Sequence, residues 1–237
     1  MSLLVQSRRP TRELLDDPSL PLSEVRHNLA DLRAVNGHWG GTRTLERHVA
    51  KRLAGLGLSG RAARILDVGA GSGYVAGRLA SALRAQRLGF PVTVVALDLQ
   101  WRHLRMGRTM HPQLEAPPVA GDAFRLPFAD GVFDLAVSTL FFHHFSPAEN
   151  GRLLSEMHRL ARHGVALLDL RRHRAPALFV SLAGPVIWHS PVTVHDGLAS
   201  VNQAYTVDEA LAIAKDAIPG ARARRVFPFR WLLTSGP

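Results

Sequence analysis

The sequence has no cysteine among its 237 residues. This absence excludes a disulfide framework, a thiolate metal site and a cysteine nucleophile, and it suits a reducing cytoplasm. Lysine is nearly absent too, occurring only as Lys51 and Lys215. The 29 basic side chains, against 19 acidic ones, are therefore almost all arginines.

The net charge of +10 raises the question of a polyanionic partner. The arginines are scattered from Arg8 to Arg230 without a long run, unlike the clustered basic patch of a dedicated nucleic-acid binder. GC-rich coding, or a loose attraction to anionic membranes or acidic metabolites, explains this pattern better. We expect no nucleic-acid partner.

The sequence also lacks an export signal and a continuous membrane span. Acidic residues follow the twin arginine at Arg8-Arg9, where a signal peptide would be apolar. The stretch 175–194 has no Asp, Glu, Lys or Arg, but Pro176, Gly184 and Pro185 interrupt it. This stretch is therefore expected to form a lid or an interfacial surface, with at most weak contact to a membrane surface. We expect a cytoplasmic protein.

Two regions differ in their apolar pattern. Residues 1–60 carry apolar side chains at helical spacing and are expected to form an amino-terminal helical lid. In residues 61–237, short apolar runs alternate with helical stretches, which predicts an α/β, Rossmann-like, doubly wound sheet with a helical insertion near 175–205. Strands are expected over 64–68, 93–97, 119–120, 133–138, 165–170, 222–226 and 229–233. Helices are expected over 77–87, 101–110 and 147–162, and from Thr206 with Glu209 as its capping partner.

The densest motif is the run Asp67–Gly73, in which three glycines at alternate positions follow an apolar strand. Such a loop lets the backbone turn tightly and approach a ligand. A P-loop would need a lysine that is missing here, and a dinucleotide fingerprint would want glycine where Tyr74 stands. The spacing therefore points away from both of these phosphate sites.

Two further acids end predicted strands. Asp98 closes the second strand, where a carboxylate can accept both hydroxyl groups of a ribose. Asp122 follows the third strand within Gly121-Asp122-Ala123, where an acid can accept a hydrogen bond from an adenine amino group. A surface acid that only caps the next helix is the simpler alternative at Asp98.

Together with Phe133-Asp134, these motifs resemble the class I S-adenosylmethionine-dependent methyltransferases, from about Arg64 to Leu170. The resemblance implies a seven-stranded sheet whose last strand is antiparallel. It also implies that the glycine loop surrounds the methionine part of S-adenosylmethionine, with the ribose at Asp98 and the adenine at Asp122. The cofactor-binding residues that it implies are Asp67, Gly69, Ala70, Gly71, Gly73, Asp98, Leu99, Gly121, Asp122, Ala123 and Thr139.

A narrower resemblance lies outside these motifs. The stretches 27–29, 36–41 and 101–108 are similar to bacterial small-molecule methyltransferases of polyketide and phenolic-lipid pathways. This similarity implies secondary metabolism and methylation of a phenolic oxygen.

A phenol ionises near pH 10, so a base within reach of its hydroxyl would assist the transfer. His143 and His144 follow the fourth strand, at the ligand-bearing edge of the sheet, and either could be that base. Both could equally be packing residues, and His38, Asp169 and His195 remain alternatives. No carboxylate spacing supports a metal at these histidines, so we expect none.

Four aromatic residues are expected to contact substrate: Trp39, Phe142, Phe179 and Trp188. The overall prediction is O-methylation of a small apolar, phenolic molecule. The alternatives are carbon methylation of a quinone-like ring, an RNA methyltransferase, or a protein that binds the cofactor without catalysis. Ser138–Phe141 replaces the Asn/Asp-Pro-Pro-Tyr/Phe motif of amino-methylating nucleic-acid enzymes, which speaks against RNA.

Overall fold

The computed structural model describes residues 5–38, 41–58, 61–188 and 190–236. The strands are β1 (Ala63–Val68), β2 (Val92–Asp98), β3 (Pro118–Ala120), β4 (Leu135–Thr139), β5 (Val165–Leu170), β6 (Arg222–Val226) and β7 (Arg230–Thr234). The helices are α1 (Leu22–His38), α2 (Gly41–Ala54), α3 (Tyr74–Ala85), α4 (Trp101–Met110), α5 (Pro147–Leu160), α6 (Arg174–Ile187), α7 (Pro191–Gln203) and α8 (Val207–Ala217), with the 3₁₀ turns η1 (Leu14–Asp16) and η2 (Phe142–His144).

The strands form one seven-stranded sheet in the order β3-β2-β1-β4-β5-β7-β6. Neighbouring strands are parallel from β3 to β5, whereas β7 pairs antiparallel with both β5 and β6. This topology confirms the predicted doubly wound sheet with an antiparallel last strand.

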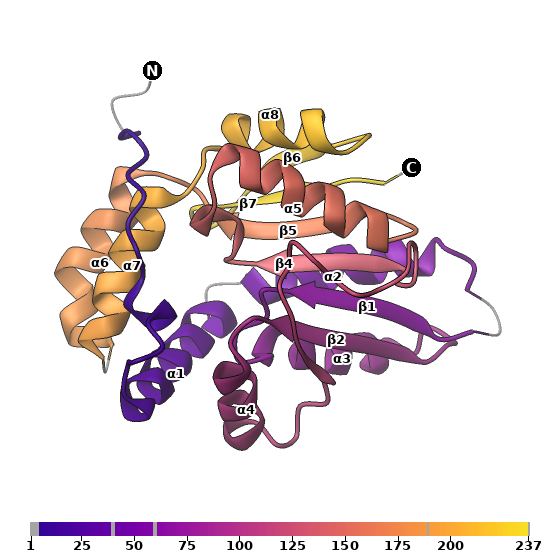
Figure 1. The fold of residues 1–237 in the computed structure, drawn as a ribbon, viewed down its shortest axis with the longest axis horizontal. Helices are drawn as coiled ribbons and strands as arrows, with labels where there is room; N and C mark the ends of the chain where they lie inside the picture. Colours follow the sequence, from indigo (N-terminus) through magenta and orange to yellow (C-terminus); the bar gives the residue numbers. More distant parts are fainter. Residues whose placement is uncertain (1–4, 39–40, 59–60, 189, 237) are drawn as a thin grey trace.

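Helices cover both faces of the sheet (Figure 1). Side chains of α2 and α3 pack with β1 and β2 in one apolar cluster, and those of α5 and α8 pack in another. Central strands such as β1 and β5 are almost continuously apolar because both of their faces are buried.

The predicted start of α8 is confirmed in atomic detail. The Thr206 hydroxyl accepts a hydrogen bond from the Glu209 amide, and the Glu209 carboxylate accepts one from the Thr206 amide. Ser146 and Glu149 form the same reciprocal cap at α5. The helix expected from residue 77 begins three residues earlier, at Tyr74, directly after Gly73.

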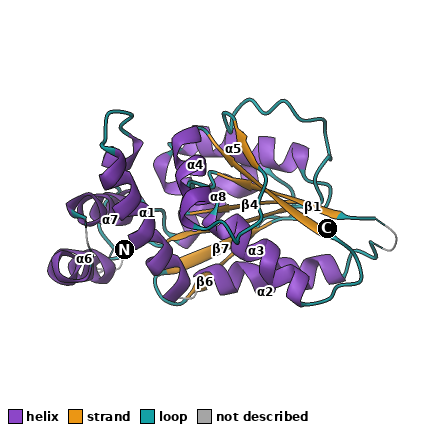
Figure 2. Ribbon diagram, turned by 90° about the horizontal axis from the view of Figure 1, so that it is seen from below, coloured by secondary structure: helices purple, strands orange, loops and turns teal. Residues whose placement is uncertain are grey.

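Three helices lie beyond the carboxyl ends of the parallel strands. Figures 1 and 2 show α1, α6 and α7 grouped at this end, with α6 outermost. The predicted insertion near 175–205 corresponds to α6 and α7. Residues 41–54 behave differently from the rest of the predicted lid, because α2 packs on the sheet. Trp39 lies outside the described residues.

The amino-terminal segment runs along α7 and is fixed there by hydrogen bonds. The Asp196 carboxylate accepts bonds from the amides of Leu14 (2.7 Å) and Leu15 (2.9 Å). The Arg8 guanidinium donates to the carbonyl oxygens of Gln203, His143 and Phe145, which belong to both α7 and the turn after β4. This segment therefore joins the outer helices to the sheet. None of the described helices combines the length and apolar character of a bilayer span.

Candidate cofactor and substrate site

A cavity of about 490 Å³ lies at the carboxyl ends of the parallel strands. The sheet contributes the glycine loop and the ends of β2 and β4, while α1, α6, α7 and the amino-terminal segment form the opposite walls. Parallel α/β sheets bind ligands at this edge. The cavity thus lies at the edge of the sheet where the sequence predicted a ligand site.

The glycine loop has the conformation that only glycine adopts without strain. Gly69 and Gly71 have φ values of 71° and 55°, and a Cβ atom on Gly69 would collide with the ring of Phe141. The Gly71 amide donates a 2.7 Å hydrogen bond to Oδ2 of Asp98. Asp98, the predicted ribose-binding acid, therefore also holds the loop in place.

Two side chains near the glycine loop have buried oxygen atoms without a hydrogen bond to the rest of the described chain. Among the described residues, the two carboxylate oxygens of Asp67 have no hydrogen-bond partner. The hydroxyl group of Thr139 has none either. Burial, followed by the charge of Asp98, raises the pKa of Asp67 to about 8. Thr139 lines the cavity, so a ligand with N–H donors can reach its hydroxyl group, while a positively charged ligand would favour the ionised form of Asp67 just outside the lining. The amino-acid part of S-adenosylmethionine has this chemistry, so the residues present fit the cofactor that the resemblance implies.

Most predicted cofactor residues line the cavity: Gly69, Ala70, Gly71, Asp98, Leu99, Gly121, Asp122, Ala123 and Thr139. Asp67 and Gly73 do not line it, because Asp67 is buried in β1 and Gly73 precedes α3. Oδ1 of Asp122 accepts a 2.9 Å bond from the Phe124 amide.

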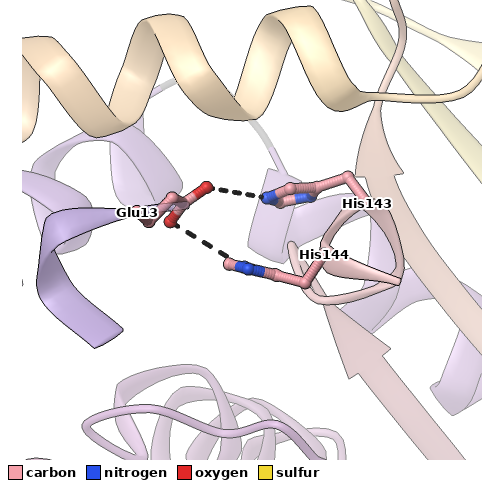
Figure 3. A group of neighbouring side chains, drawn as sticks. All are labelled: Glu13, His143 and His144. Carbon is pink, nitrogen blue, oxygen red and sulfur yellow. Dashed lines mark hydrogen bonds and ion pairs between the residues drawn. The ribbon is translucent and has the colours of Figure 1, made fainter. Parts of the chain in front are cut away.

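Glu13, His143 and His144 line the cavity and point toward one another (Figure 3). Nδ1 of His143 lies 2.7 Å from Oδ1 of Asp169, and Nε2 of His143 lies 3.3 Å from Oε1 of Glu13. Glu13 also accepts hydrogen bonds from Ser200 and Gln203. The ring of His144 stacks on that of His143, with 4.4 Å between ring centroids.

The two histidines differ in charge. Burial favours neutral His143, but Asp169 and Glu13 outweigh it and raise the pKa of His143 to about 10. Burial and the neighbouring charge of His143 lower the pKa of His144. Glu13 stays ionised, because both histidines lower its pKa to about 2 despite burial. At neutral pH, His143 is therefore a cation and His144 a neutral imidazole.

The nitrogens of His144 remain available to a ligand. They lie 3.8 Å from Oε2 of Glu13 and 3.6 Å from Oδ2 of Asp16, beyond hydrogen-bond length. His144 lines the cavity and is 22% exposed, whereas His143 is 2% exposed. Of the two predicted bases, His144 is placed to take a proton.

Glu13, His143 and His144 could also hold a metal ion, because one ligand atom from each lies within 4.8 Å of the others. Both ring nitrogens of His143, however, already face carboxylate oxygens. A protonated His143 accounts for this arrangement without a cation. The absence of a metal remains a prediction.

The predicted substrate residues have different positions. Phe179 and Trp188 line the cavity. The structure corrects the prediction for Phe142, which is 1% exposed and packs edge-on against Tyr205 and Trp231 in the core. Successive side chains in a 3₁₀ turn point about 120° apart, so Phe142 faces inward while His144 faces the cavity.

Sequence reasoning missed Glu13 and Asp16. No local motif marks either residue, and the partners of Glu13 lie 130 and more positions away. Of the alternative bases, Asp169 is engaged with His143, and His195 pairs with Asp196 outside the cavity lining. The side chain of His38 lies outside the described part of the structure.

Known proteins resemble both the sequence and the fold. Residues 65–164 match a family described as a methyltransferase domain. A demethylmenaquinone methyltransferase from Beutenbergia cavernae is 39% identical over 105 residues, which cover 44% of this chain and 39% of that protein. A malonyl-[acyl-carrier protein] O-methyltransferase from Geobacter sulfurreducens is 44% identical over 80 residues, 34% of this chain and 28% of the relative.

Two solved structures share the fold over most of the chain. An S-adenosylmethionine-dependent methyltransferase from Aquifex aeolicus aligns with a TM-score of 0.54 at 20% identity, covering 80% of this chain and 87% of that one. Magnesium protoporphyrin IX methyltransferase from Synechocystis, solved with bound S-adenosylmethionine, aligns with a TM-score of 0.55 at 15% identity, covering 91% and 90%. The chain spans less than half the length of the curated relatives named above. Residues 65–164 therefore match a methyltransferase domain, and the fold is the one that these two solved methyltransferases share.

Proposed function

We propose that the whole chain transfers a methyl group from S-adenosylmethionine to an ionisable ring hydroxyl of a small apolar molecule. One observation carries this proposal: a neutral histidine, His144, faces an apolar cavity beside the glycine loop. A neutral imidazole can accept the proton that a phenol must lose, and its ring is fixed by stacking on His143.

When bound, the cofactor supplies a methyl group on a positively charged sulfur. The protein has to align the acceptor, exclude water and remove one proton. His144 accepts the hydroxyl proton at one of its ring nitrogens. Glu13 and Asp16, 3.8 and 3.6 Å from those nitrogens, stabilise the imidazolium that forms.

The acceptor atom we propose is the phenolic oxygen. A carbon of a hydroxylated, quinone-like ring is the second candidate, which the similarity to a demethylmenaquinone methyltransferase favours. Both acceptors need the same ring hydroxyl ionised, so His144 would serve either. A carboxylate acceptor is already ionised at neutral pH and would need no base.

The test uses ¹³C-methyl-labelled cofactor with a panel of phenols, hydroquinones, malonyl thioesters and RNA. The ¹³C shift of the product distinguishes a methoxy group from a ring methyl group. His144→Gln should lower turnover by about 10²–10⁴-fold while binding of S-adenosylhomocysteine is unchanged. The control is His158→Gln on α5, away from the cavity lining.

The pH dependence gives a second readout. Turnover of the wild type should rise with pH through an apparent pKa below 6.5, because the base must be neutral. His144→Gln should lose this limb of the profile. If His144→Gln keeps wild-type turnover on a phenol, or only thioesters or RNA accept the label, the proposal is wrong.

A further inference from the structure

The outer side of α6 carries a row of exposed apolar side chains. Leu178, Leu182 and Val186 are spaced four residues apart, and they are 60%, 71% and 87% exposed. Ile187 and Phe179 extend this row, which we call the α6 stripe. Five of the ten exposed large apolar side chains in the described part of the chain lie on this one helix. Apolar exposure of this kind, gathered on one element, marks an interaction surface.

The stripe is held on a firm support. The opposite side of α6 packs against α7, where Val180 is buried and a Cβ atom on Gly184 would collide with the Trp188 ring. Pro176 and Val180 on this inner side line the cavity, and Phe179, at the edge of the stripe, lines it as well. The helix therefore separates the cavity from whatever covers the stripe.

The exposed charges on the amino-terminal segment, α1, α6 and α7 are mostly positive. Helix α6 has no acidic residue and begins with the exposed Arg174. Among residues 5–38 and 171–205, five arginines are exposed against a single acid, Asp16. The exposed arginines are Arg9, Arg12, Arg26, Arg33 and Arg174. The elements at this end of the molecule thus carry exposed apolar and cationic side chains together.

We propose that the α6 stripe docks on the surface of an anionic lipid bilayer. Apolar side chains enter the boundary between headgroups and acyl chains, while each nearby arginine gains about 1 kcal/mol from anionic headgroups. A second copy of this face would bring arginines against arginines, which is unfavourable. A bilayer accommodates both the stripe and the positive charge.

Docking would place the cavity wall against the membrane. Phe179 lines the cavity and is also 36% exposed, so an apolar acceptor dissolved in the bilayer meets this wall first. This supply of acceptor rests on the proposed function, whereas the docking does not depend on which reaction takes place.

The experiment is flotation of the full chain with phosphatidylcholine vesicles, with and without phosphatidylglycerol. The wild type should float with the anionic vesicles, and high salt should weaken this binding. Leu182→Glu combined with Val186→Glu should weaken it by about tenfold or more, since two apolar contacts are replaced by anions. Gln86→Glu combined with Gln113→Glu adds the same charge at exposed positions outside α6 and should float like the wild type. Both altered proteins should unfold at the wild-type temperature, because the changed side chains are exposed.

A fluorescent probe locates the contact. The chain has no cysteine, so Val186→Cys and Gln86→Cys can each carry a single environment-sensitive dye. The dye at position 186 should shift to the blue with anionic vesicles, and the dye at position 86 should not. Absence of flotation by the wild type, or equal flotation by the α6 variant, would overturn the proposal. Light scattering that finds a dimer which the α6 variant abolishes would also overturn it, in favour of a contact between copies.

Discussion

Replacing Asp169 by asparagine tests the ion cluster behind His144. Asp169 is the last but one residue of β5 and is 1% exposed. It accepts hydrogen bonds from the His143 amide (3.2 Å) and the Leu170 amide (2.6 Å). Asparagine keeps the size and one acceptor oxygen but removes the charge. His143 then keeps Glu13 as its remaining anionic partner.

The expected loss of stability follows from the pKa of His143. A rise from 6.5 to about 10 corresponds to roughly 5 kcal/mol of stabilisation, shared between Asp169 and Glu13. Removing one partner of a buried ion pair lowers the free energy of unfolding by about 3–5 kcal/mol. We therefore expect Asp169→Asn to lower the free energy of unfolding by about 3 kcal/mol or more near pH 6. Because the folded-state pKa of His143 is raised, this stabilisation is complete below pH 6.5 and is lost as the pH rises through about 10.

Urea unfolding at pH 6 and at pH 9.5 measures both effects, and the difference between Asp169→Asn and wild type should shrink at the higher pH. Asp130→Asn is the control, because Asp130 pairs with Arg159 while its side chain is 80% exposed. Exposed ion pairs contribute little, so this control should stay close to wild type at both pH values. An equal loss of stability at pH 6 and pH 9.5 would refute the assignment of a charged His143.

Two predictions concern the cofactor side of the cavity. Asp98→Ala should weaken binding of S-adenosylhomocysteine by about 1.5–3 kcal/mol, measured by calorimetry, and unchanged affinity would remove Asp98 from the site. The pKa of Asp67, about 8, leaves this carboxyl protonated at pH 7, and a ligand ammonium would favour its ionised form. Binding at pH 7 should therefore release a proton, visible as different heats in buffers of different ionisation enthalpy, and affinity should rise with pH up to about 8. Asp67→Asn should abolish this release; a release that persists in the variant would show that another group titrates.

The sheet and its motifs could be predicted because local sequence determines them. The boundaries of β5 and α4 agree with prediction to the residue: an arginine pair follows the apolar run of β5, and His111-Pro112 ends α4. The positions of the loop glycines and of Asp98 are also determined locally. The glycine loop follows β1, Asp98 ends β2, and these two strands pair in the sheet.

The arrangement of the cavity wall could not be predicted in the same way. Glu13 reaches His143 across 130 residues, and nothing in the spacing of either residue encodes that contact. Which of Phe142 and His144 faces the cavity depends on where the 3₁₀ turn after β4 begins. If the turn began one residue earlier or later, different side chains would face inward and outward. Long-range packing, rather than local propensity, determines which of these side chains meets a ligand.

The anchoring of the amino-terminal segment has a consequence for how the chain folds during synthesis. Residues 6–15 leave the ribosome before any of their partners: the carbonyl groups after β4, the Asp196 carboxylate, and Gln203 at the end of α7. This segment must therefore wait for these partners until some 190 further residues have been made. Glu13 can therefore take its place in the cavity wall only after Ser200 and Gln203 of α7 have been made.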